Sequence, residues 1–114
     1  MNTWFDDTDS NNTVPAGEEG YFGPINILAD KDLTLFVSCV NAFTFRIQYT
    51  DDTSADPYWF EHCDSTGALI TFTCEGLDGV AHRKAIPLSM KAQRMRIIAS
   101  NGGATEEAPY IGVM

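Results

Sequence analysis

The sequence predicts an all-β protein, a single β-sandwich or jelly roll of seven or eight mostly antiparallel strands with an extended N-terminal arm. In Phe43–Tyr49 every odd position is large and apolar and every even position is polar, which is the pattern of a half-buried strand. The best helical competitor, Ser89–Arg94, is too short to persist alone. Turn-forming residues recur about every eight to twelve residues, as in sandwiches. A second sheet is therefore expected to cover the apolar face.

The expected strands follow one another along the chain with short turns between them. The first is expected at 24–28 and the second at 33–40. Asn41 and Ala42 predict either a sharp reversal into the strand at 43–49 or a bulge in one long bent strand. The polar segment after it predicts a loop, and the remaining strands are expected at 58–63, 68–74, 80–88, 92–99 and 109–113. The predicted division is an acidic arm over 1–23 and a β-sandwich domain over 24–114.

Composition fits one globular domain and excludes two classes of partner. The chain has 114 residues, of which 44% are hydrophobic, enough for a single core. The formal net charge of −9 and the pI of about 4.3 argue against nucleic acid and anionic membranes, because both attract Lys and Arg. The first residues lack the pattern of a secretory signal, and no segment reaches the roughly 20 apolar residues of a membrane helix. We expect synthesis in a reducing cytosol.

The first 23 residues differ from the rest in composition. They contain five acids and no Lys or Arg, and their apolar content is concentrated near the start in the pair Trp4 and Phe5, which Asp6 and Asp7 follow, and at the end in Tyr21 and Phe22. A Trp-Phe pair is costly to leave in water, so this end is predicted to dock on a partner. The alternative is a plain disordered tail, since acidic segments with few apolar residues seldom fold alone.

Positive charge is concentrated in the segment 83–96, which holds five Lys and Arg residues and no acid. Arg94 and Arg96 alternate with apolar residues and are predicted to project from the same solvent-facing side of one strand. The acidic arm of one copy is therefore expected to lie on the basic strand of a neighbour. Folding back within one chain, or a merely solvated strand face, would satisfy the same charges.

The cysteines and histidines do not form a catalytic or metal-binding pattern. Cys39, Cys63 and Cys74 lie in strand-like apolar runs and are expected as buried free thiols, with a Cys63–Cys74 bridge as the alternative. His62 precedes Cys63, but neighbouring strand positions point to opposite faces, which excludes a Cys-His dyad. No metal and no other cofactor are expected. A small thiol or cupin-like enzyme would require His62 and His82 to converge in one cavity.

The loop between the third and fourth strands carries the residues of an alternative ligand site. Asp51, Asp52 and Asp56 supply carboxylates for calcium, or else bond to nearby backbone N–H groups and shape the turn. Trp59 is a sugar-stacking platform if its ring is exposed, and a core residue if it is not.

The sequence resembles two groups of proteins. Phe43–Asp52, with Ala85–Ser89 and Arg94–Ala99, looks like galactose-binding-like jelly rolls, in which a strand precedes an aspartate-rich loop and a late strand alternates Arg with aliphatic residues. This likeness covers about half the chain and implies a carbohydrate-binding β-sandwich module. In its small size and acidic arm, the chain also resembles small phage virion proteins that decorate a capsid or tail. This second resemblance implies a structural role.

We therefore predict a non-enzymatic structural or assembly protein of a phage particle, such as a capsid decoration or tail protein, with a carbohydrate-binding β-sandwich module as the alternative function. The expected partners are copies of itself, or a larger protein shell or tail, with glycan as the alternative. The expected location is the virion, with the cytoplasm as the alternative. Contact is predicted through Trp4, Phe5, Asp6, Asp7, Arg94 and Arg96. The alternative site comprises Asp51, Asp52, Asp56 and Trp59.

Overall fold

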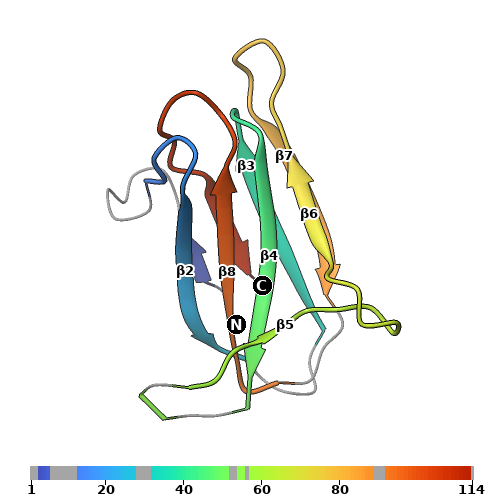
Figure 1. The fold of residues 1–114 in the computed structure, drawn as a ribbon. Helices are drawn as coiled ribbons and strands as arrows, with labels where there is room; N and C mark the ends of the chain where they lie inside the picture. Colours follow the sequence, from blue (N-terminus) through green and yellow to red (C-terminus); the bar gives the residue numbers. More distant parts are fainter. Residues whose placement is uncertain are drawn as a thin grey trace.

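The computed structural model describes residues 3–5 (backbone), 13–27, 32–51, 54–55, 57–88 and 92–113, which form a two-layer β-sandwich (Figure 1). One sheet has the order β1 (Thr3–Phe5), β9 (Tyr110–Val113), β3 (Leu33–Cys39), β7 (His82–Leu88). The other has the order β2 (Glu19–Asn26), β8 (Arg94–Asn101), β4 (Phe43–Thr50), β5 (Phe60–Glu61), and β6 (Thr71–Cys74) also pairs with β4. All these pairs are antiparallel, so the predicted fold class is confirmed. The described residues contain no helix long and apolar enough to span a membrane.

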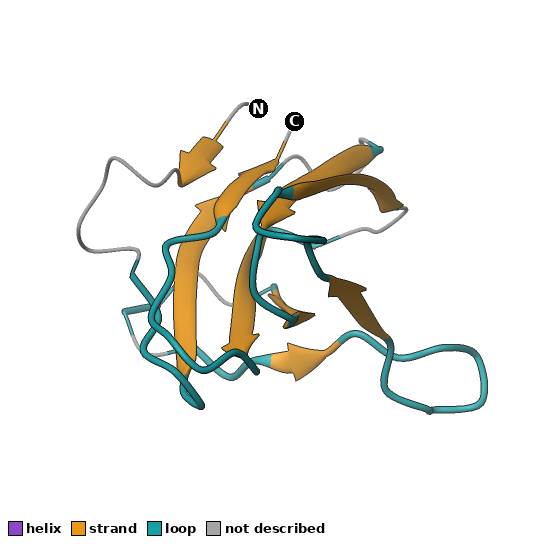
Figure 2. Ribbon diagram, turned by 90° about the horizontal axis from the view of Figure 1, so that it is seen from above, coloured by secondary structure: helices purple, strands orange, loops and turns teal. Residues whose placement is uncertain are grey.

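The core lies between the two sheets, which face each other when viewed along the strands (Figure 2). Strand β4 alternates as expected, because Phe43, Phe45 and Ile47 are buried while Thr44 between them is exposed. Strand β8 buries Met95, Ile97 and Ala99 in the same way, and in the register Ala99 lies opposite Phe45 and Ile97 opposite Ile47. The two central strands of the five-stranded sheet therefore present one apolar face inward and one polar face outward.

The connection between β3 and β4 carries the chain from one sheet to the other. Strand β3 pairs with β7 and β9, whereas β4 pairs with β8, so residues 40–42 form neither a hairpin nor a bulge in one long strand. The carboxylate of Glu107 accepts hydrogen bonds from the backbone N–H groups of Val40 (2.7 Å) and Asn41 (2.6 Å). A residue more than 60 positions away thus fixes this crossing, which explains why local turn signals left it open.

Part of the segment expected to form an arm belongs to the sandwich. Strand β2 begins at Glu19 and buries Phe22, so the boundary expected after residue 23 falls inside a strand. Val14 is fully buried and forms a bridge with Glu107. The backbone of β1, which contains Trp4 and Phe5, pairs with β9 of the same chain. Asp6 and Asp7 lie outside the described residues.

Two cysteines are buried and one is exposed. Cys39 and Cys74 lie on facing sheets, and the Cys39 thiol donates a hydrogen bond to the backbone carbonyl of Cys74 (3.2 Å). Burial, together with the neighbouring Cys74 thiol, raises the pKa of Cys39 well above its usual range. Cys63 is exposed because the expected strand at 58–63 is reduced to Phe60–Glu61, which corrects the expectation that all three are buried. All three thiols are free, so the alternative Cys63–Cys74 bridge is not formed.

Replacing Tyr49 with phenylalanine is expected to leave the protein as stable at pH 7, or more stable by about 1 kcal/mol. Its hydroxyl is buried without a hydrogen-bond partner, and burial raises the pKa of Tyr49 to about 12. An unfolded chain loses this proton near pH 10. The folded state therefore holds more protons between pH 10 and 12, and stability falls as pH rises through that window. Tyr49→Phe should remove the part of this decrease in the free energy of unfolding that Tyr49 causes, about 2 to 3 kcal/mol.

Urea unfolding of both proteins at pH 7 and between pH 10 and 12 measures the effect. The ring contact with His62 (centroids 5.3 Å apart) is kept in the variant. A loss of more than about 1 kcal/mol at pH 7 would mean that the hydroxyl is hydrogen-bonded in solution.

Candidate functional site

The outward side of the five-stranded sheet carries a connected group of polar and aromatic side chains. Alternation along β4 and β8 turns Arg46, Gln48, Arg94 and Arg96 away from the core, as predicted for the two β8 arginines. Strand β2 adds Glu19 and Tyr21, strand β5 adds Glu61, and the segment before β5 adds Trp59. We call these residues the polar sheet face: Glu19, Tyr21, Arg46, Gln48, Trp59, Glu61, Arg94 and Arg96.

Arg96 is at the centre of the polar sheet face, between two aromatic rings. Its guanidinium carbon lies 4.6 Å from the ring centroid of Trp59 and 5.2 Å from that of Tyr21. Its Nε donates a hydrogen bond of 2.6 Å to Gln48, the residue opposite it on β4. Cation–π contacts of this length are attractive, and more so where water is partly excluded. Three different elements therefore hold one guanidinium in a fixed orientation.

A chain of polar contacts continues from Gln48 across the sheet. The Gln48 amide donates to one oxygen of Glu61, whose other oxygen lies 3.6 Å from Nε of Arg46. On the opposite side, Arg46 forms a second ion pair with Glu19 (3.4 Å). Ile98 of β8, which lies between Arg46 and Tyr21 in the register, is fully buried among these side chains. Both carboxylates of the face are thus bound to the same cation.

Arg94 is engaged by the segment that precedes β5. Its guanidinium donates to the backbone carbonyl of Ser54 (3.1 Å) and lies 5.8 Å from the centroid of Trp59. Trp59 is half-buried against both arginines of β8, so neither proposed role, an open platform or a core residue, describes it fully. Asp51 is exposed, and Asp52 and Asp56 lie outside the described residues.

The predicted positive segment does not form one surface. Arg83 lies on β7 of the four-stranded sheet, opposite Ser38, while Arg94 and Arg96 lie on the other sheet. The two histidines are likewise separated, since His62 follows β5 and His82 begins β7. Within the described part of the chain, no group of three or more His, Cys, Asp or Glu side chains is arranged to hold a metal ion.

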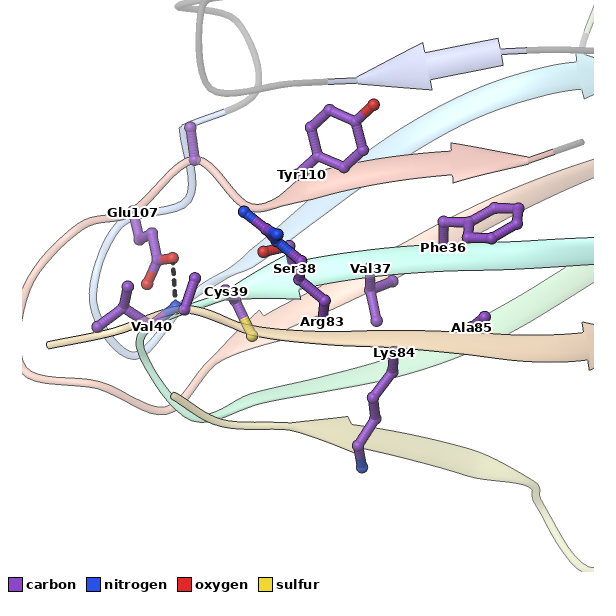
Figure 3. A pocket seen from close by; sticks show the side chains of 12 residues that line it. Phe36, Val37, Ser38, Cys39, Val40, Arg83, Lys84, Ala85, Glu107 and Tyr110 are labelled. Carbon is purple, nitrogen blue, oxygen red and sulfur yellow. Dashed lines mark hydrogen bonds between the residues drawn. The ribbon is translucent and has the colours of Figure 1, made fainter. Parts of the chain in front are cut away.

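A shallow groove of about 690 Å³ lies over the four-stranded sheet (Figure 3). Figure 3 shows Tyr110 and Phe36 on neighbouring strands among the residues that line it, and Arg83 beside Ser38. Glu107 closes one end, with its carboxylate bound to backbone N–H groups of the β3–β4 connection. The groove and the polar sheet face belong to different sheets of the sandwich.

Sequence reasoning found three members of the polar sheet face, Trp59, Arg94 and Arg96, but missed the others. The even positions of β4 carried a usable signal, because alternation predicts that Arg46 and Gln48 are on the outer side. Tyr21 lay in the segment assigned to the arm, and only the register of β2 with β8 brings it beside Arg96.

Comparison with solved structures finds a distant likeness in fold. A carbohydrate-binding module of Cellvibrio mixtus lichenase 5A, in complex with cellotriose, aligns with 97% of this chain and 95% of its own, at 12% identity and a TM-score of 0.40. No protein-family model matches the sequence, and no curated protein matches it.

Proposed function

We propose that this protein is a non-catalytic carbohydrate-binding β-sandwich that holds its ligand on the polar sheet face. The observation that carries the proposal is the placement of Arg96 between Tyr21 and Trp59 beside a connected row of hydrogen-bonding side chains. A sugar ring has apolar C–H faces that pack on aromatic rings, and hydroxyl groups that both donate and accept hydrogen bonds. The polar sheet face offers partners for both features.

The aromatic contribution comes from Tyr21 and Trp59. Tyr21 is 60% exposed, so much of its ring is open to solvent although Arg96 contacts it. Trp59 is half-buried and supplies a second ring on the other side of the guanidinium. Large rigid rings give contact area at a low cost in conformational entropy.

The polar contribution comes from Glu61, Arg46 and Glu19, whose side chains are partly exposed, while Gln48 is only 8% exposed and holds Glu61 and Arg96 in place. Each is held by a neighbour, so the row already has a fixed geometry before a ligand binds. Pre-organised groups bind more tightly because little order has to be created on binding. A carboxylate can accept two parallel hydrogen bonds, and a guanidinium can donate two. This bidentate geometry suits two adjacent sugar hydroxyls.

The proposal of binding without catalysis also rests on the two carboxylates. Glycoside hydrolysis ordinarily uses a pair of Asp or Glu residues, one of them a protonated acid. On the polar sheet face Glu19 and Glu61 are both ion-paired to Arg46. Both carboxylates are thus held by one guanidinium as fixed hydrogen-bond acceptors, an arrangement that suits recognition of hydroxyl groups.

Glycan binding is expected to weaken by about tenfold or more in Trp59→Ala and in Tyr21→Ala. Isothermal titration calorimetry against oligosaccharides of glucose, mannose, galactose and galacturonic acid measures the affinity. Tyr110→Ala, which removes an aromatic ring from the opposite sheet, is the matched control and should bind like the natural protein. Circular dichroism checks the fold of each variant. Unchanged affinity in both test variants, or an equal loss in the control, would contradict the proposed site.

The predicted role in assembly, in a phage virion or elsewhere, stays a prediction. Trp4 and Phe5 belong to β1, whose backbone pairs with β9 of the same chain. Docking of this segment on another copy would thus compete with an intramolecular pairing. Light scattering over a concentration series, with and without the first 12 residues, measures self-association, and a concentration-independent monomer would remove a second copy from the expected partners.

A further inference from the structure

We infer that the polar sheet face selects acidic sugars, with Arg96 binding the carboxylate of a uronic acid residue. This inference rests on the proposed carbohydrate-binding function and adds the class of glycan. It is carried by the difference between the two arginines at the centre of the face, Arg46 and Arg96.

Arg46 is ion-paired to two carboxylates of the protein itself. Glu19 and Glu61 approach it from opposite sides at 3.4 Å and 3.6 Å. Arg96 lies on the neighbouring strand, opposite Gln48, and has no described carboxylate within ion-pair distance. This is unusual in a chain that carries 16 acids and only 7 Lys and Arg. Its described partners are a neutral amide and two rings.

The contacts of Arg96 use only part of its hydrogen-bonding capacity. A guanidinium has five N–H donors, and Nε is the one that bonds to Gln48. The two terminal nitrogens form a planar fork whose geometry matches a carboxylate. Because Gln48, Tyr21 and Trp59 fix the plane of the group, this fork is oriented before the ligand arrives.

The neighbours of Arg96 suit the rest of a uronic acid residue. The open part of the Tyr21 ring can take the apolar face of the sugar, while the exposed carboxylate of Glu61 accepts hydrogen bonds from its hydroxyls. The net charge of −9 repels a densely charged polymer over distance, and salt screens this repulsion. Selectivity should therefore be measured with short oligosaccharides at physiological ionic strength.

The test compares trigalacturonate with its fully methyl-esterified form, which keeps the sugar rings and removes the charges. We expect the acid to bind the natural protein about tenfold or more tightly than the ester. Arg96→Gln should lower the affinity for the acid to that for the ester. Arg96→Lys should restore part of the preference, because it keeps the charge but not the fork. Arg83→Gln, with the same change in net charge on the opposite sheet, should leave the preference unchanged.

The outcomes separate this inference from the proposed function. Equal affinity for acid and ester, or a stronger binding of neutral oligosaccharides, would overturn the inference while leaving carbohydrate binding in place. A preference lost equally in Arg83→Gln would also overturn it, because overall charge would then be the cause. If neither acidic nor neutral oligosaccharides bind, the proposed function fails with it. Circular dichroism and urea unfolding of each variant exclude a loss of fold as the cause.

Discussion

Replacing Phe45 with alanine is expected to lower the free energy of unfolding by about 3 to 5 kcal/mol. Phe45 is fully buried near the middle of β4, and its ring stacks on Phe43 with centroids 5.7 Å apart. In the register it lies between Ala99 of β8 and Phe72 of β6. Truncation removes the transfer free energy of the ring and leaves a cavity that these neighbours fill only in part. Since a domain of this kind is stable by about 5 to 15 kcal/mol, the variant should lose a large share of its stability.

Urea denaturation followed by circular dichroism measures this loss. The matched control is Phe60→Ala in β5, where the side chain is 65% exposed and a change within about 0.5 kcal/mol is expected. A loss below about 1 kcal/mol for Phe45→Ala, or equal losses for the two variants, would contradict the assigned core.

Replacing Asn101 with alanine is expected to destabilise the protein by about 2 to 4 kcal/mol. The side chain is only 2% exposed and connects three segments at one end of the sandwich. Its amide donates to the backbone carbonyls of Val14 and Thr105, both at 2.9 Å, and its oxygen accepts from the N–H of Gly103 (2.9 Å). Alanine removes all three bonds: the Gly103 N–H loses its described partner, while the carbonyls of Val14 and Thr105 each lose one of two donors and keep those from Glu107 and Asn41.

Thermal and urea unfolding of Asn101→Ala measure the effect, with Asn26→Ala as the control. Asn26 is an exposed asparagine at the end of β2, so its replacement should change stability by no more than about 0.5 kcal/mol. Native-like stability of Asn101→Ala would mean that water replaces the amide without cost, and the network would then not hold the N-terminal segment in place.

The alternation along β4 and β8 predicted both strands and the sides on which their residues lie. Such predictions succeed because a strand buried on one face repeats every two residues whatever its partners are. Prediction failed where a distant contact decides the structure. Glu107 fixes the crossing between β3 and β4, and the burial of Val14 and Phe22 brings part of the expected arm into the sandwich.

In the candidate site, too, local patterns predicted some features and distant contacts decided the others. Arg94 and Arg96 were predicted on one outward face, because their spacing in β8 requires it. Their contacts with Trp59 and Tyr21 depend on how a loop and another strand pack against β8, which no local pattern contains. Of the three aspartates expected to form a site with Trp59, the structure describes Asp51, which is exposed, while Asp52 and Asp56 lie outside the described residues.

The central claim, that a glycan binds on the polar sheet face, is tested most directly by NMR. Backbone amide and side-chain N–H shifts of the full-length protein are followed during titration with trigalacturonate and with neutral oligosaccharides. We expect the largest shifts at the Trp59 indole, the Arg96 guanidinium and the amide of Tyr21, and no shifts at Ser38 and Tyr110 on the other sheet. Shifts centred on the groove beside Arg83, or no shifts with any of these sugars, would contradict it.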